Sequence, residues 1–66
     1  MLTNSRDIRR RLEQDGWILD RVAGSHHVFR KPGSDVVISL PHPKKDLGTG
    51  LVRQIYKLAG WPLNER

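Results

Sequence analysis

The sequence predicts an α+β domain in which two helices pack on one face of a three-stranded antiparallel sheet. Two segments with apolar residues at helical spacing lie near the ends of the chain, and three short β-type segments lie between them. Short turns separate the β-type segments, so neighbouring strands should be antiparallel. The predicted elements are a helix over 4–15, strands over 17–22, 26–30 and 35–40, and a helix over 49–59.

The first helix is predicted from an apolar face and a glycine stop. Ile8 and Leu12 lie one turn apart. Gly16 stands where helices commonly end in a left-handed residue. Three residues can cap the N-terminus of this helix: Thr3, Asn4 and Ser5.

The strands are predicted from runs of β-branched and aromatic residues with turn signals between them. A Val-Val-Ile run in 35–40 is the strongest β signal in the chain. A short turn over 23–25 separates the first two strands. A second turn over 31–34 contains a Pro-Gly pair, which is typical of tight turns.

The middle strand divides its residues between the two faces of the sheet. Because alternate residues of a strand point to opposite sides, His26, Val28 and Arg30 share one face, while His27 and Phe29 share the other. Phe29 is the natural core residue of this strand. We therefore expect His27 to face the helices, and His26 and Arg30 to lie on the face that is open to solvent.

The second helix follows an irregular segment at 41–48. Two prolines flank His42 there, and residues that precede proline are restricted to extended geometry. Leu51, Ile55 and Leu58 then fall at helical spacing. A Gly-Trp-Pro triplet ends the helix, with glycine first and proline just after.

The chain is short, so we expect one small domain over 1–66 with a thin core. A chain of 66 residues buries only about 60% of its unfolded surface. With no cysteine, neither disulfides nor a Cys-ligated zinc site can stabilise it. At least one of the two tryptophans should stay half exposed. The residues expected in the core include Trp17, Phe29, Leu51, Ile55 and Trp61.

The charge of the chain favours a polyanionic partner. Twelve Lys and Arg against seven Asp and Glu give a net charge of +5, which suits RNA, DNA or an acidic protein. No apolar run approaches the ~18 residues of a membrane span, and the first residues lack an apolar signal region. A cytoplasmic location is therefore expected.

The basic residues form clusters that allow two interpretations. The arginines of the first helix form either a polyanion surface or a solvated face, which Arg9–Glu13 and Arg11–Asp15 pairs would partly neutralise. Two lysines precede the second helix, whose N-terminal N–H groups also suit phosphate. The candidate polyanion contacts are Arg6, Arg10, Arg21, Arg30, Lys44 and Lys45.

His26 is the best candidate for proton transfer, although an exposed histidine is often only a surface residue. Imidazole ordinarily titrates near pH ~6.5, so it exchanges protons at neutral pH. Gly24 and Ser25 form a turn without bulk, which would let a large ligand approach. His26 and His27 point to opposite faces, so we expect no metal site and no cofactor. His42 is either a second proton-transfer group or a structural residue.

Two motifs stand at the spacing of a known family. Gly-Ser-His-His-Val-Phe occupies 24–29, and Pro-His-Pro-Lys-Lys-Asp-Leu occupies 41–47. With Gly16 and Trp17 before them and Ala-Gly at 59–60 after them, the chain resembles the HicA toxin family over about 5–61. The resemblance implies a double-stranded-RNA-binding-domain-like fold with the order α-β-β-β-α.

The resemblance also implies a function. HicA proteins are the toxins of type II toxin–antitoxin pairs, and they cleave mRNA and thereby stop translation and growth. The catalytic histidine of the family corresponds to His26, and the glycine of the same motif corresponds to Gly24. A HicB-like antitoxin is the implied partner and would cover His26. The free chain is expected to be a monomer.

Three functions follow as hypotheses. The first is a metal-independent endoribonuclease in which His26 accepts the 2′-hydroxyl proton and a cation stabilises the transition state. The second is a double-stranded RNA-binding module that cuts nothing. The third is a protein-interaction domain with an acidic partner. The candidate cations for the first are Arg21, Arg30, Lys44 and Lys45.

Overall fold

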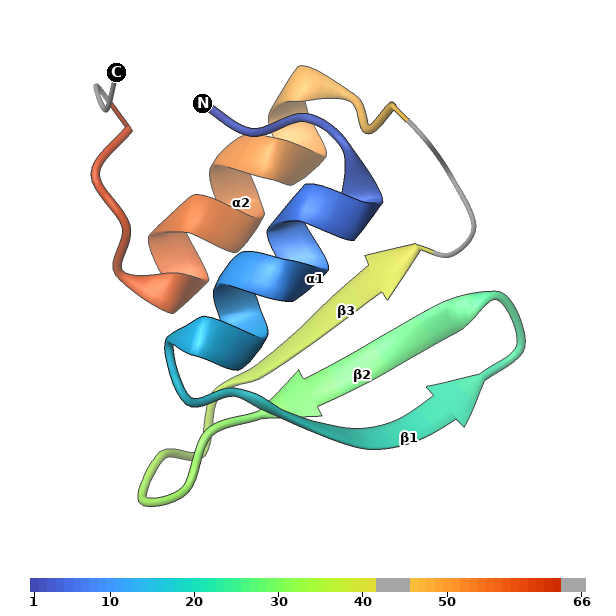
Figure 1. Cartoon of the computed structure of the whole chain (residues 1–66), viewed down its shortest axis with the longest axis vertical. Coiled ribbons are helices and arrows are strands. Elements are labelled where there is room, and N and C mark those ends of the chain that lie inside the picture. The colour runs from blue at the N-terminus through green and yellow to red at the C-terminus, as the bar shows by residue number, and fades with distance from the viewer. Residues whose placement is uncertain (42–45, 64–66) are drawn as a thin grey trace.

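The computed structural model describes residues 1–41 and 46–63, and its elements follow the order α-β-β-β-α (Figure 1). Predicted and observed bounds agree for the second strand and the second helix and differ by one or two residues elsewhere. Neither helix in this part of the chain is long and apolar enough to cross a membrane. The elements are α1 (Ser5–Gln14), β1 (Ile18–Ala23), β2 (His26–Arg30), β3 (Val37–Pro41) and α2 (Thr49–Ala59).

The three strands form one antiparallel sheet in the order β1-β2-β3, and both helices lie on the same face of it (Figure 1). The helices run in the same direction. One hydrogen bond links the segments just before the two helices, and another links the segments just after them. At the start, the Leu47 N–H donates to the Thr3 carbonyl at 2.8 Å. At the end, the Trp61 indole N–H donates to Asp15 Oδ2 at 3.2 Å. The predicted fold class is confirmed.

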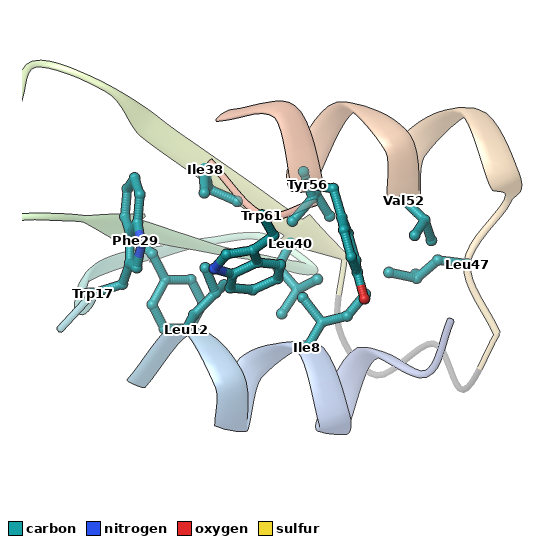
Figure 2. Close-up of a cluster of buried hydrophobic side chains, with 11 residues drawn as sticks. Ile8, Leu12, Trp17, Phe29, Ile38, Leu40, Leu47, Val52, Tyr56 and Trp61 are labelled. Atoms are coloured by element: carbon teal, nitrogen blue, oxygen red, sulfur yellow. The ribbon is translucent and has the colours of Figure 1, made fainter. Parts of the chain in front are cut away.

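The core fills the space between the helices and one face of the sheet (Figure 2). Each helix contributes residues one turn apart, and β2 and β3 contribute alternate residues, as amphipathic elements do. Leu51 is only partly buried and packs against the edge of this core. The core residues are Ile8, Leu12, Trp17, Phe29, Ile38, Leu40, Leu47, Val52, Ile55, Tyr56 and Trp61.

Both tryptophans are buried, so the expectation of a half-exposed tryptophan is wrong. Trp17 is 4% exposed and Trp61 is 8% exposed. The chain after α2 turns back and brings Trp61 edge-on against Tyr56, with ring centroids 5.1 Å apart. The Arg11 guanidinium lies 4.4 Å from the centroid of the Trp61 ring and covers its outer side. A long cation therefore replaces the apolar surface that so short a chain lacks.

The structure shows which residue caps the N-terminus of α1 and shows one of the charge pairs predicted on this helix. Asn4 is the N-cap, since its side chain accepts the Arg6 N–H at 2.9 Å. Arg9 and Glu13 form the predicted pair at 3.8 Å. Gly16 has a φ of +94°, which is the left-handed conformation predicted for this position.

Asp15 links the C-terminal ends of both helices to the sheet. It accepts the Trp61 N–H, and the Lys31 Nζ lies 3.6 Å from its Oδ2. The hydrogen bond from Trp61, together with the positive charge of Lys31, holds the pKa of Asp15 below its ordinary value of 3.8. A carboxyl with a lowered pKa stabilises the fold while it is ionised and loses that effect when it is protonated.

We expect Asp15→Asn to lower the melting temperature at pH 7 by a few degrees. Exposed ion pairs contribute about 0.2–1 kcal/mol, and about 1 kcal/mol shifts a small domain by about 4–8 °C. The contribution is complete above pH 3.8 and is lost as the pH falls through the lowered pKa, so the two proteins should converge in acid.

Circular dichroism melts over a pH series measure this difference. Asp35→Asn is the matched control, because Asp35 is exposed in the turn before β3. A difference between native and Asp15→Asn chains that stays constant down to acid pH would contradict the assigned role of the charge.

Candidate functional site

The hairpin between β1 and β2 places His26 at the start of the central strand. Ala23 pairs with His26, which leaves Gly24 and Ser25 as a two-residue turn. Gly24 has a φ of +59°, and such tight hairpin turns need a residue that adopts positive φ without strain. The backbone geometry thus explains this glycine. His26 is exposed and lies on the face of the sheet away from the helices, as predicted.

His27, the next residue of β2, lies on the other face of the sheet. It is buried on the helix side, where Leu40 of β3 lies opposite it. Val28 belongs to the open face by alternation but is also buried. It lies in the central strand between Arg21 on β1 and Ser39 on β3, and these neighbours flank it on both sides. On the open face, the buried Val28 thus lies close to the exposed imidazole of His26.

Ser39 holds the ring of His26 from the adjacent strand. Its hydroxyl lies 3.1 Å from His26 Nδ1, within hydrogen-bond distance. Among the residues that the structure describes, no hydrogen bond to Nε2 is present, and the ring is exposed. A hydrogen bond at one ring nitrogen fixes the ring and leaves the other for a substrate. Sequence reasoning missed Ser39, because its place beside His26 depends on the β2–β3 register.

A β-bulge at Asp20 turns Arg21 toward the open face. Leu19 pairs with Phe29 and Arg21 pairs with Val28, so the register shifts between them. In a regular strand Leu19 and Arg21 would share a face. The extra residue shifts the alternation by one, so Leu19 lies on the helix side and Arg21 on the open side.

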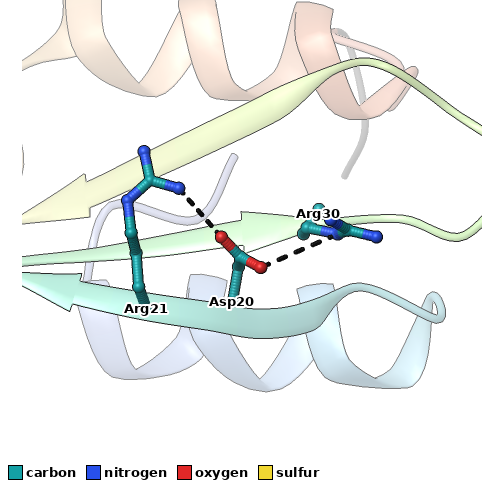
Figure 3. Close-up of polar contacts among 3 residues, drawn as sticks. All are labelled: Asp20, Arg21 and Arg30. Atoms are coloured by element: carbon teal, nitrogen blue, oxygen red, sulfur yellow. Dashed lines mark hydrogen bonds and ion pairs between the residues drawn. The ribbon is translucent and has the colours of Figure 1, made fainter.

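The carboxylate of Asp20 lies between two arginines of the open face (Figure 3). Arg21 Nη1 donates to Asp20 Oδ2 at 2.8 Å, and Arg30 Nε lies 3.8 Å from Oδ1. The side chains of Arg21 and Arg30 are 63% and 61% exposed. Two guanidinium groups against one carboxylate leave a positive charge and outward N–H groups that suit a phosphate. Asp20 is a second residue that sequence reasoning missed.

The fold separates two of the other predicted contacts, Arg6 and Arg10, from this face. Arg6 and Arg10 are exposed on α1, in the helical layer on the other side of the sheet (Figure 1). Lys44, Lys45 and His42 lie outside the described residues. Within residues 1–41 and 46–63, no three His, Cys, Asp or Glu side chains come together as a metal site.

Comparisons with known proteins agree with the fold. A family model described as the HicA toxin of bacterial toxin-antitoxin matches residues 5–61. A solved structure of a HicA3 and HicB3 toxin-antitoxin complex contains a chain that is 37% identical, with a TM-score of 0.72. The match covers 92% of the present chain and 98% of that chain. A comparison with curated protein sequences gives no match. With a family match over nearly all of its length and a closely similar solved structure, the chain belongs to the HicA toxin family.

Proposed function

We propose that this toxin is a metal-independent endoribonuclease that cleaves mRNA in the cytoplasm and thereby arrests translation and growth. The observation that carries the proposal is the exposed imidazole of His26, oriented by Ser39 on a face that also carries two arginines. RNA contains its own nucleophile, the 2′-hydroxyl. A site that removes its proton and stabilises negative charge on the phosphate is sufficient for cleavage.

The proposed reaction begins with proton transfer to His26. Nε2 accepts the 2′-hydroxyl proton while the 2′-oxygen attacks the adjacent phosphorus. The bond from phosphorus to the 5′-oxygen of the next nucleotide then breaks, and that oxygen takes up a proton from water, while His26 returns its proton to solvent. The products are a 2′,3′-cyclic phosphate and a 5′-hydroxyl end. Ser39 keeps Nε2 directed outward throughout, because it holds Nδ1 on the other side of the ring.

Arg21 and Arg30 are the proposed phosphate contacts on the open face. Their guanidinium groups present planar N–H donors, which match the geometry of phosphate oxygens. Asp20 restrains both side chains and so lowers the entropy cost of binding. Gly24 and Ser25, in the adjacent turn, remain proposed contacts because they lie beside His26 at the end of the same hairpin.

The proposed partner is a HicB-like antitoxin that covers the His26 face. The similar chain comes from a HicA3 and HicB3 toxin-antitoxin complex, which supports a partner of this kind. The two exposed arginines favour acidic groups on the antitoxin surface that meets them. Covering Nε2 would block proton transfer directly. The free toxin is proposed to be a monomer.

His26→Ala should abolish RNA cleavage and leave RNA affinity within about twofold, because proton transfer contributes about 10²–10⁴-fold to such reactions. The assay combines cleavage of a defined RNA by purified protein, with and without a chelator, and growth after induced expression. Arg53→Ala on α2 is the control, since Arg53 is exposed in the helical layer.

Growth arrest by His26→Ala equal to that by the native chain would contradict catalysis. It would favour the non-catalytic double-stranded RNA-binding module of the same fold.

Ser39→Ala should lower kcat about three- to tenfold and leave KM unchanged, because a net hydrogen bond is worth about 0.5–1.5 kcal/mol. Ser39 acts on the reaction through the imidazole that it holds, so it is a positioning residue. Ser39→Thr keeps the hydroxyl and should restore kcat. Steady-state kinetics of the three proteins test this, and a Thr variant as slow as the Ala variant would contradict the positioning role.

Arg21→Ala should weaken RNA binding and reduce the slope of log K against log salt by about 0.7–0.9, the value for one phosphate contact. Binding measured by fluorescence anisotropy over a salt series gives both quantities. Arg53→Ala removes the same charge from the helical layer and should leave the slope nearly unchanged. Equal slopes for both variants would mean that Arg21 acts only through net charge.

A further inference from the structure

A groove runs along the outer edge of β3, between that strand and α2, and His26 forms part of its wall. It has a volume of about 320 Å³. On α2 the lining residues follow one another at helical spacing, so they form one continuous stripe. We call it the β3–α2 groove, and its main lining residues are His26, Val37, Ser39, Leu51, Gln54 and Leu58.

The lining of the β3–α2 groove suits a nucleobase better than a phosphate. None of its described lining residues is an acid, a lysine or an arginine. Val37 is 51% exposed and Leu58 is 40% exposed, so the groove presents apolar side chains to solvent. Apolar walls with a few convergent polar groups are typical of sites for flat organic ligands. The Gln54 amide adds a donor and an acceptor that can pair with the edge of a base.

The position of the groove relative to Arg21 matches the layout of a nucleotide. Arg21 lies on β1, on one side of the central strand, whereas the groove lies along β3 on the other side. His26 stands between Arg21 and the groove, because it belongs to the central strand β2 and also lines the groove. A nucleotide has its phosphate on one side of the ribose and its base on the other. A ribose above His26 would therefore direct its phosphate toward Arg21 and its base into the groove.

We propose that the β3–α2 groove binds the base of the nucleotide whose 2′-hydroxyl attacks the phosphorus, and that Gln54 hydrogen-bonds to the edge of that base. This inference rests on the proposed ribonuclease function and adds a source of sequence preference to it. The cut position is then set by the base immediately 5′ to the broken bond. Leu51 and Leu58 contact the faces of this base, and Gln54 distinguishes one base from another.

The test uses RNA strands that differ at one nucleotide only, the one 5′ to the mapped cut. This nucleotide carries each of the four bases in turn, or an abasic ribose. We expect removal of the base to lower kcat/KM about tenfold or more, because the apolar burial of the base is lost. Gln54→Leu should reduce the spread among the four bases by about fivefold or more. Gln14→Leu on α1 is the matched control and should keep the native spread.

A second measurement separates binding of the base in the groove from cleavage of the RNA. RNA strands with a 2′-deoxy nucleotide at the same position cannot be cleaved by the proposed route. Their affinity for the protein therefore reports binding without cleavage, and the strands with and without the base can be compared directly. Equal affinity with and without the base would overturn the groove proposal even where cleavage depends on His26. Base-dependent affinity in a native chain that cuts no RNA would support the groove as a base site and contradict the ribonuclease function.

A protein partner is the competing occupant of the groove. Leu58→Asp places a charge on its wall and should weaken base-dependent RNA binding. A Leu58→Asp chain that handles every RNA strand as the native chain does, but no longer binds a coexpressed antitoxin, would assign the groove to the antitoxin and overturn the proposal. Native-like folding of this variant is checked by its circular dichroism melt, and Gln54→Leu provides the answer where Leu58→Asp does not fold.

Discussion

The structure depends on a core that is built on one face of the sheet only. A chain of 66 residues buries too little surface to cover both faces, so both helices and both tryptophans serve the same side. Trp61 illustrates how completely this side is used, since Asp15 binds its indole N–H and Arg11 covers its ring. The opposite face stays open. A large ligand such as RNA can reach a flat open face directly, which an enclosed pocket in so thin a core would not permit.

The central strand β2 supplies both the core and the site. Phe29 and His27 are buried on the helix side, while His26 and Arg30 are exposed on the other. The burial of Phe29 therefore fixes the position of the exposed residues, because alternate side chains cannot turn independently of one another. A functional group on a strand that is paired on both edges is held more rigidly than one on a loop. In the proposed reaction this rigidity keeps the imidazole in place without a metal.

The remaining parts of the site come from the two edge strands. The bulge at Asp20 directs Arg21 to the open face, and the register of β3 brings Ser39 to His26. Bulges commonly redirect a side chain next to a functional site, and this one also supplies the carboxylate that restrains two arginines. The β3–α2 groove adds an apolar border on the far side of β3. Arg21 and the apolar groove thus lie on opposite sides of one imidazole, an asymmetry that suits the two ends of a nucleotide.

Local sequence patterns determined the order of the elements, their bounds to within two residues, and the side of the sheet on which His26 lies. These features depend on side-chain periodicity, on caps such as Asn4 and on glycine stops, all of which act within a few residues. Only the tertiary structure decided that Ser39 contacts His26, that Arg21 faces the same side, and that Trp61 is buried against Asp15. Each of these depends on a contact between segments that are distant in sequence or on a one-residue shift in strand pairing. Such contacts leave no local signal, because they are set by how the strands and helices fit together around a shared core.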